Sequence, residues 1–531
     1  MKVVRMFAAL LVFSSALHAA PSSSGNHGSS STATKAAATA ATTTGPTSGT
    51  VIVNAGGAVQ DPSDTVPAGS IGTIVAGPKT VNGIVYVNVL WSAESAAFQN
   101  NYNGWTPINS LSAYTGTGTT PTNPPPTTPP PTTPPPTTPP PTTPPPTTPP
   151  PTTPPPTTTS SGLKIIGYYP RYAIEDGFYP KNLISNGTIK SLTTINFAFA
   201  NIVNNKCASF NTADDYTTRV SAGNSVSGAA DSSFGGTFHQ FQELKAQYPN
   251  LKIIVSIGGG SVSASTIANA ASASNRSAFV ASCINMYIKG NFGGGISQPG
   301  IFDGFDIDWE FPASATDRSN FTGLLSEFRS QLDAIKSGYT LSIAGPNGSW
   351  AWQYIDLVTT QKYLNYVNLM TYDYAGPWNN ETGLVAPLYR STSDPSPTDN
   401  GSSTVQGYEA AGMPASMLVF GVPFYGYEWS GVPNQDHGLF EPGSPANQGA
   451  TYTAIVATES KFTAYRDSVS QSPYLFNGSS FWTYEDPTSI KFKMTYVVNQ
   501  KLAGVMIWNL EQDLSNGTLF NAVASGLASA N

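Results

Sequence analysis

The chain has 531 residues, too many for one ordinary domain, and only 10% of them are charged. Its net charge of −7 provides no basic excess of the kind that nucleic acids and anionic membranes attract, so neither is expected as a partner. The four histidines are scattered without metal-ligand spacing, and neither a metal site nor a cofactor is predicted.

Residues 1–20 have the composition of a secretory signal. They begin with two basic residues and continue as an apolar run with small residues near Ala19: MKVVRMFAALLVFSSALHAA. A membrane anchor is the alternative, but the run is shorter than the about 20 apolar residues that a span needs. Because no later segment is long and apolar enough to cross a bilayer, the sequence predicts a secreted, extracellular protein, expected to be soluble and monomeric.

A small all-β module is predicted after the signal. Residues 21–47 are rich in Ser, Thr and Ala and are expected to be disordered. Residues 48–115 hold short strand-like stretches between Gly, Pro and Asn turns, namely TVIVNA, GSIGTIVAGP, GIVYVNVLW and GWTPINSLSAY. The Gly-Trp of the last stretch resembles the end of bacterial Src-homology-3-like domains. Trp91, Tyr102 and Trp105 are either a sugar-binding face or core residues of this module.

Residues 116–161 repeat the motif PPPTT. Proline blocks both helix and sheet, so the repeat predicts a polyproline II tether. At about 3.1 Å per residue, some 40 residues reach on the order of 100 Å. Such a linker lets one module hold a surface while another works on it.

Residues 162–531 form the large domain, in which eight apolar runs rich in β-branched residues recur. These are LKIIGYY, LTTINFAFA, LKIIVSIGG, GFDIDWEF, YTLSIAGP, LNYVNLMTYD, SMLVFGVPFYG and LAGVMIWNL. Segments of helical texture, such as NFTGLLSEFRSQLDAIKSG, lie between them. Eight strands alternating with helices predict an α/β fold, a (β/α)8 TIM barrel.

The gap before the eighth run, about residues 427–500, is far longer than a crossover helix. It contains three pieces that look like strands, TYTAIVA, YLFNG and SSFWTYED. The sequence therefore predicts a small α+β insertion before the eighth strand.

The fourth run, DGFDIDWEFP at residues 303–312, places Asp306, Asp308 and Glu310 at every second position. Residues two apart on a strand share a face. In a barrel strand these acids point inward and climb toward the C-terminal mouth, where active sites of this fold lie. A solvated surface strand explains the alternation equally well, but not the barrel context. Three inward carboxylates repel one another and lose hydration, and both effects destabilise the fold. A protein is expected to keep such acids only where they serve a function.

DGFDIDWEFP resembles the D-x-x-D-x-D-x-E signature of chitinases of glycoside hydrolase family 18. Other family motifs follow in the expected order: SIGG at 256–259, MTYD at 370–373, PFYG at 423–426 and the Trp of MIWNL at 508. The resemblance covers the whole large domain and none of residues 1–161.

The resemblance implies a role for each acid. Glu310 is expected to be the general acid, and Asp308 to hold the N–H of the substrate's 2-acetamido group. Asp306 is expected beneath Asp308, sharing a proton with it and accepting hydrogen bonds from Tyr168 and Ser256.

The resemblance also implies residues that hold the sugar. Tyr372 is expected to donate to the acetamido oxygen, with Met370, Asp373 and Tyr425 around the same pocket. Trp508 is expected to be the floor on which the bound sugar stacks; without the resemblance, a core tryptophan is the plainer interpretation.

Two positions depart from the family pattern. Tyr427 stands where many relatives have an arginine that often contacts sugar, and Gly260 stands where many have a tryptophan after SIGG. Other stacking groups are candidates in loops, and about half of such residues are ordinary packing: Trp350, Trp352, Trp378 and Trp429.

The two cysteines, Cys207 and Cys283, are compatible with a disulfide in an exported protein, and equally with two small buried side chains.

The favoured function is hydrolysis of β-1,4 bonds between N-acetylglucosamine units of chitin. An endo-β-N-acetylglucosaminidase acting on glycoprotein or cell-wall glycans is the alternative. A non-catalytic chitin lectin is less favoured, because inactive relatives usually lack the acid at the position of Glu310.

Overall fold

The computed structural model describes residues 162–395 and 399–530, and the backbones of seven short strands between Gly49 and Ala113. The predicted signal, the Ser/Thr/Ala-rich segment and the Pro/Thr linker lie outside the described residues. The N-terminal strands and the C-terminal domain belong to two separate compact units.

The N-terminal strands form where the sequence predicts them. Five pair in an antiparallel sheet of order β6-β5-β4-β1-β7: β1 (Gly49–Val53), β4 (Ile71–Val81), β5 (Ile84–Trp91), β6 (Tyr102–Pro107) and β7 (Leu111–Ala113). The short strands β2 (Ala58–Val59) and β3 (Thr65–Val66) pair with each other. The likeness to Src-homology-3-like domains stays a prediction, and the side chains of its three candidate aromatics lie outside what the structure describes.

The C-terminal domain is built around a closed barrel of parallel strands. In order around the barrel these are β8 (Lys164–Pro170), β9 (Thr194–Val203), β11 (Lys252–Gly258), β14 (Gly304–Asp308), β15 (Thr340–Gly345), β16 (Tyr366–Leu369), β17 (Leu418–Pro423) and β23 (Gly504–Trp508). Pairing of β23 with β8 and of β8 with β9 closes the ring. All eight predicted strands are confirmed, and DGFDIDWEF contains the fourth, β14.

Helices cover the outside of the barrel. They are α1 (Pro180–Ser185), α2 (Gly236–Gln247), α3 (Ala264–Ala271), α4 (Arg276–Cys283), α5 (Ala315–Ile335), α6 (Ser349–Trp352), α7 (Leu357–Thr360), α8 (Gly401–Ala410), α10 (Pro487–Asn499) and α11 (Thr518–Ala530). The predicted helix after the fourth strand is α5, and its Ser314 cap accepts a hydrogen bond from the Asp317 N–H.

Alternation along β14 separates its apolar residues from its acids. Phe305 packs against Phe328 of α5, with ring centroids 5.2 Å apart, and Trp309 packs against Phe321 at 5.4 Å. All four of these side chains are almost fully buried. Phe305 and Trp309 therefore point outward to α5, and the intervening acids face the barrel interior, as predicted.

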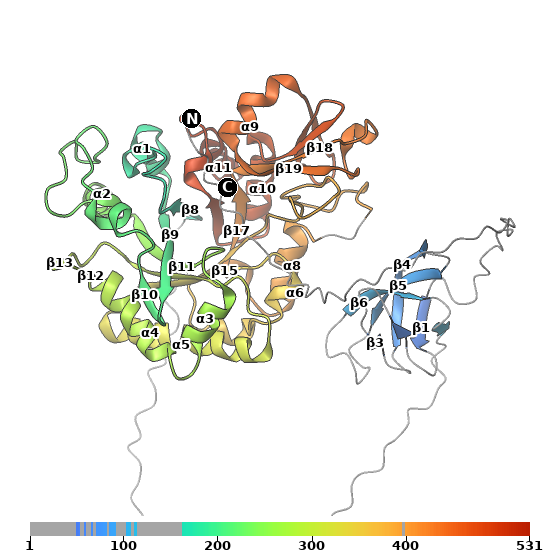
Figure 1. Ribbon diagram of the computed structural model, residues 1–531, viewed down its shortest axis with the longest axis horizontal. Coiled ribbons are helices and arrows are strands. Elements are labelled where there is room, and N and C mark those ends of the chain that lie inside the picture. Colours follow the sequence, from blue (N-terminus) through green and yellow to red (C-terminus); the bar gives the residue numbers. More distant parts are fainter. Residues whose placement is uncertain are drawn as a thin grey trace, which may run out of the picture. The chain divides into compact units, whose positions relative to one another are not determined.

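An insertion separates β17 from α10, and Figure 1 shows it in orange. Its antiparallel sheet has the order β19-β18-β22-β21-β20, with strands β18 (Tyr425–Ser430), β19 (Ser444–Thr451), β20 (Thr463–Arg466), β21 (Pro473–Phe476) and β22 (Ser480–Thr483). One predicted strand was wrong: TYTAIVA forms the helix α9 (Tyr452–Thr458). The side chain of Thr451 caps this helix by accepting from the Ala454 N–H, which outweighs the β-branched composition.

A disulfide joins Cys207 to Cys283. Cys207 lies on β10 (Lys206–Ala208), which extends the barrel sheet beside β9, and Cys283 ends α4. The structure thus decides between the two alternatives that the sequence left open. In the part of the chain that the structure describes, no helix combines the length and apolarity of a membrane span.

Candidate active site

Asp306 lies in a polar layer inside the barrel and is fully buried. Its Oδ2 accepts hydrogen bonds from the hydroxyls of Tyr168 and Ser256, both at 2.7 Å. Its Oδ1 accepts from the Ser342 hydroxyl at 2.7 Å and from Asn368 Nδ2 at 3.2 Å. Burial raises the pKa of Asp306, and these four donors act in the opposite direction. The predicted contacts from Tyr168 and Ser256 are confirmed.

Two partners of this layer, Ser342 on β15 and Asn368 on β16, were not predicted. Each is a polar residue inside an otherwise apolar strand, with TLSIAG around the first and YVNL around the second. A buried strand position that holds a polar residue needs a hydrogen-bond partner. That pattern is the signal by which sequence reasoning finds such residues.

Asp308 lies one layer above Asp306 and is almost fully buried. Among the described residues its Oδ1 has no hydrogen-bond partner. Burial raises the pKa of Asp308 well above its usual range, and the charges of Glu310 and Asp306 raise it further. The carboxyl group is therefore held in its protonated form more readily than an ordinary aspartate, with a free oxygen for a ligand.

The glycines of SIGG allow β11 to approach β14 at this level. Gly258 has a φ of +115°, and a Cβ there would lie 2.1 Å from the carbonyl oxygen of Asp308. The N–H of Gly259 donates to that same oxygen at 2.8 Å. A side chain at position 258 would therefore displace the strand that bears the acids.

Glu310 follows β14 at the mouth of the barrel and is partly accessible to solvent. Burial raises the pKa of Glu310 to about 7, and the charge of Asp373 contributes to the increase. The backbone N–H of Gly260 donates to this carboxyl group and acts in the opposite direction. A carboxylic acid with a pKa near neutrality is suited to general acid–base catalysis.

Asp373 lies after β16 in a left-handed backbone conformation, with a φ of 61°. Its Oδ1 accepts from the hydroxyls of Tyr425 at 2.6 Å and Tyr427 at 2.9 Å. Burial raises the pKa of Asp373, and the two hydroxyl donors oppose that effect. The insertion thus supplies, through β18, two side chains that hold a carboxylate of the barrel.

Tyr372 is buried beside these acids. The centroid of its ring lies 6.2 Å from that of Tyr425. Its hydroxyl lies 3.9 Å from the sulfur of Met506, a weak acceptor. Burial raises the pKa of Tyr372 well above its usual range, and the charges of Asp308 and Asp373 add to this. The hydroxyl therefore stays protonated and is a hydrogen-bond donor. Met370, two residues earlier, is partly exposed.

Trp508 ends β23 and is partly exposed. Its ring stacks on Phe199, with centroids 5.5 Å apart and planes at 23°, and lies 5.3 Å from the ring of Tyr168. Since Tyr168 also donates to Asp306, this aromatic floor adjoins the acid layer. Phe199 was not among the predicted site residues.

The candidate loop tryptophans divide into two classes. Trp350 and Trp378 are each 58% exposed, whereas Trp429 is fully buried and donates to the carbonyl oxygen of Asn379. Trp352 packs against Tyr408, with ring centroids 5.8 Å apart. Exposure leaves the first two as candidates for stacking on sugar and assigns the other two to packing.

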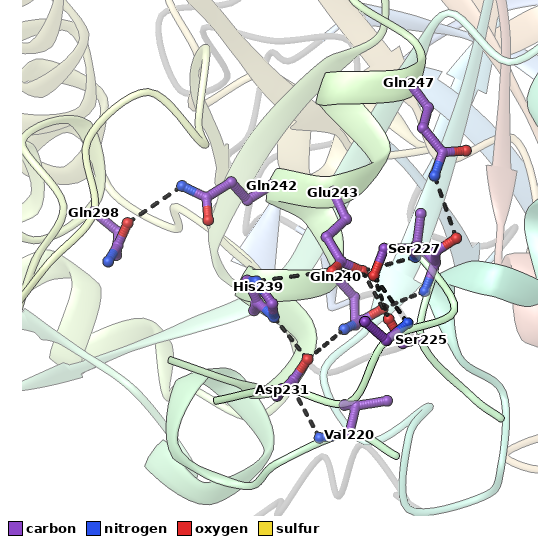
Figure 2. Close-up of polar contacts among 12 residues, drawn as sticks. Val220, Ser225, Ser227, Asp231, His239, Gln240, Gln242, Glu243, Gln247 and Gln298 are labelled. Carbon is purple, nitrogen blue, oxygen red and sulfur yellow. Dashed lines mark hydrogen bonds and ion pairs between the residues drawn. The ribbon is translucent and has the colours of Figure 1, made fainter. Parts of the chain in front are cut away.

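A cluster of Asp231, His239 and Glu243 lies outside this site (Figure 2). His239 Nδ1 lies 2.7 Å from Asp231 Oδ1, and its Nε2 lies 3.9 Å from Glu243 Oε1. The carboxylates also accept hydrogen bonds from other protein donors, namely Val220, Ser225, Ser227 and Gln240. Because protein donors occupy these oxygens, we interpret the cluster as an attachment of residues 220–231 to α2.

Residues 164–513 match the family model for glycosyl hydrolases family 18. The chain belongs to this family. Chitinase C of Streptomyces lividans is 30% identical over 375 residues, covering 66% of this chain and 58% of that protein. Chitinase A1 of Niallia circulans is 30% identical over 426 residues, covering 68% of this chain and 58% of that protein. The matched region is thus less than two thirds of either relative.

Solved structures of family 18 domains share this fold. The catalytic domain of the psychrophilic chitinase B from Arthrobacter TAD20 is 31% identical, with a TM-score of 0.66 over 70% of this chain and 96% of that chain. A family 18 N-acetylglucosaminidase from Paenibacillus barengoltzii is 27% identical, with a TM-score of 0.56 over 69% of this chain and 100% of that chain. Proteins similar to this chain therefore include more than one kind of family 18 enzyme.

Proposed function

We propose that the family 18 domain hydrolyses β-1,4 bonds between N-acetylglucosamine units of chitin. The observation that carries the proposal is that the three acids of β14 and its C-terminal end have different surroundings. Asp306 accepts from four hydrogen-bond donors, Asp308 has an oxygen with no partner among the described residues, and the pKa of Glu310 is raised to about 7. These are the properties expected of a fixed lower acid, a ligand-binding middle acid and a proton-transferring upper acid.

The spacing of these acids favours a nucleophile that belongs to the substrate. Asp308 ends β14 and Glu310 follows it two residues later, so both approach a sugar from the same side. An ordinary retaining glycosidase places its two carboxyl groups on either flank of the bond, about 5–5.5 Å apart, and family 18 is an exception in which the substrate assists.

In the proposed first step, the acetamido oxygen of the substrate forms a bond to the anomeric carbon. The bond from that carbon to the glycosidic oxygen breaks, and the proton of Glu310 passes to the departing oxygen. Asp308 accepts the acetamido N–H and stabilises the positive charge of the resulting oxazolinium ion, while Tyr372 donates to the acetamido oxygen before attack.

In the second step, water attacks the anomeric carbon and Glu310 takes up one of its protons. The bond from the acetamido oxygen to that carbon breaks, which restores the acetamido group. The product keeps the β configuration, which proton NMR of the earliest products measures.

We also propose that the enzyme is secreted and acts as a monomer on polymeric chitin. The signal-like segment at residues 1–20 and the disulfide, a bond typical of oxidising compartments, support secretion. The Pro/Thr-rich segment at residues 116–161 is proposed to tether the N-terminal module, at 48–115, to the catalytic domain at 162–531.

One pair of assays tests the proposed substrate. Purified protein is incubated with colloidal chitin and, separately, with a high-mannose glycopeptide, and released sugars are measured by mass spectrometry. Chitooligosaccharides from the first substrate support the proposal. Release of the glycan from the glycopeptide, with no product from chitin, would contradict the proposal and identify the protein as an endo-β-N-acetylglucosaminidase.

A further inference from the structure

Tyr427 is a buried tyrosine on the first strand of the insertion, β18. Its hydroxyl donates to Asp373 Oδ1 at 2.9 Å, and the hydroxyl of Tyr425 donates to the same oxygen at 2.6 Å. Residues two apart on a strand share a face, which explains why both side chains reach one carboxylate.

Among the described residues, no positive charge is paired with the carboxylate of Asp373. Within residues 162–395 and 399–530, none of the ion pairs includes Asp373. The titratable groups that face it are two tyrosines of β18, the neighbouring Tyr372, and Glu310 from the end of β14. The charge of Asp373 therefore acts on Glu310 without a cation to offset it.

Asp373 and Glu310 differ in the donors that stabilise their ionised forms. Asp373 accepts two hydroxyl hydrogen bonds, whereas Glu310 accepts one backbone N–H, from Gly260. When two interacting carboxyl groups hold one proton between them, hydrogen bonds to the charged form decide which group ionises first. The tyrosines of β18 thus direct the first ionisation to Asp373.

We propose that Tyr427 is a positioning residue that keeps the negative charge on Asp373 and the proton on Glu310. The inference rests on the proposed function, in which Glu310 is the general acid. An arginine at this position, as many relatives have, would place a cation within reach of the same carboxylate and would offset its charge. The tyrosine holds it without a charge, so Glu310 keeps its proton to a higher pH.

The first test compares Tyr427→Phe with the wild-type enzyme on a soluble chitooligosaccharide across the pH range. The variant loses one of the two hydroxyl donors, so Glu310 is ionised in a larger share of molecules. We expect kcat on the pH plateau to fall roughly tenfold, with KM within about twofold. Tyr465→Phe is the matched control, because Tyr465 of β20 stacks on His437 and Tyr474 instead. It is expected to keep the wild-type profile.

The second variant, Tyr427→Arg, separates the hydrogen bond from the charge. A cation within reach of a carboxylate shifts pKa values by about one unit or more. We expect this variant to keep kcat on the plateau, while the pH at which activity is lost on the basic side falls by about one unit.

A substrate-free measurement separates this inference from the proposed function. The side-chain carboxyl carbons of Glu are labelled with 13C, and the signal of Glu310 is assigned by its loss in Glu310→Gln. We expect this signal to titrate near pH 7 in the wild-type protein and at lower pH in Tyr427→Arg. A Glu310 titration that Tyr427→Arg does not move overturns the inference whether or not chitin is the substrate. Where the wild-type enzyme turns over chitooligosaccharides, a Tyr427→Phe variant with an unchanged plateau overturns it as well.

Discussion

Two neighbouring regions of the barrel hold carboxyl groups in opposite ways. In the inner layer, Asp306 is buried and accepts hydrogen bonds from four side chains on four different strands. At the mouth, Asp308 has an oxygen without a partner among the described residues, and Glu310 has one backbone donor beside the charge of Asp373. Hydrogen bonds in the inner layer therefore hold Asp306 in place, whereas Asp308 and Glu310 at the mouth have oxygens that can bind a ligand or exchange protons.

The largest effect that tests this contrast is expected at Glu310. Glu310→Gln keeps the shape of the side chain and removes the transferable proton. Because a general acid typically contributes about 10²–10⁴-fold to the rate, kcat on chitooligosaccharides is expected to fall by at least that much. Calorimetry is expected to show that the oligosaccharide still binds. A variant that keeps more than a tenth of wild-type turnover would remove Glu310 from this role.

The two aspartates of β14 are expected to differ in stability. Asp306→Asn places an amide NH₂ among four donors, so at least one hydrogen bond is lost, and the free energy of unfolding is expected to fall by about 1–3 kcal/mol. Asp308→Asn disturbs a side chain whose Oδ1 has no partner among the described residues, and unfolding is expected to stay within about 0.5 kcal/mol of wild type. Urea denaturation of both variants measures the difference. Equal losses of stability would contradict the distinction between the two regions.

The pH dependence of activity is expected to follow the ionisation of Glu310 at the mouth of the barrel. Burial and the charge of Asp373 raise the pKa of Glu310 to about 7. A general acid works in its protonated form, which is present below that pKa and is lost as the pH rises through it. We therefore expect kcat/KM to reach its plateau about one pH unit below 7, to be about half of the plateau near pH 7, and to fall about tenfold per pH unit well above it. A profile that stays flat to pH 9 would show that no such group controls the reaction.

The smallest effect is expected from removal of the N-terminal part. The N-terminal strands belong to a different compact unit from the acids, so deleting residues 21–160 is expected to leave turnover of soluble oligosaccharides unchanged. On solid chitin the rate is expected to drop if the module binds polymer, because the tether then raises the local concentration of substrate. Parallel assays on the two substrates measure this. A loss of activity on soluble substrate would show that the module belongs to the catalytic domain.

Much of this arrangement was predictable because barrel strands alternate. The period of two placed Asp306, Asp308 and Glu310 on the inner face, and the eight apolar runs became eight parallel strands. The helix α9 was not predicted, because a capping side chain at Thr451 outweighed the strand-like composition that follows it. Local composition therefore identified the barrel more securely than the insertion.

The partners of the acids were harder to predict. Ser342 and Asn368 contact Asp306 from strands 36 and 62 residues away, and Tyr427 reaches Asp373 across 54 residues. Contacts between distant segments depend on register and side-chain direction, which a sequence motif does not contain. The disulfide between Cys207 and Cys283 joins residues 76 apart in sequence, and the motifs left it undecided for the same reason.

The central claim is that the acetamido group of the substrate is the nucleophile, with Asp308 and Glu310 serving it from one side. Hydrolysis of partially deacetylated chitosan tests this most directly, because each new reducing end records the sugar whose bond was cut. The new reducing ends are labelled and identified by mass spectrometry. The account predicts that they are N-acetylglucosamine throughout, whatever the degree of deacetylation. New reducing ends of glucosamine, in proportion to its content in the polymer, would contradict it.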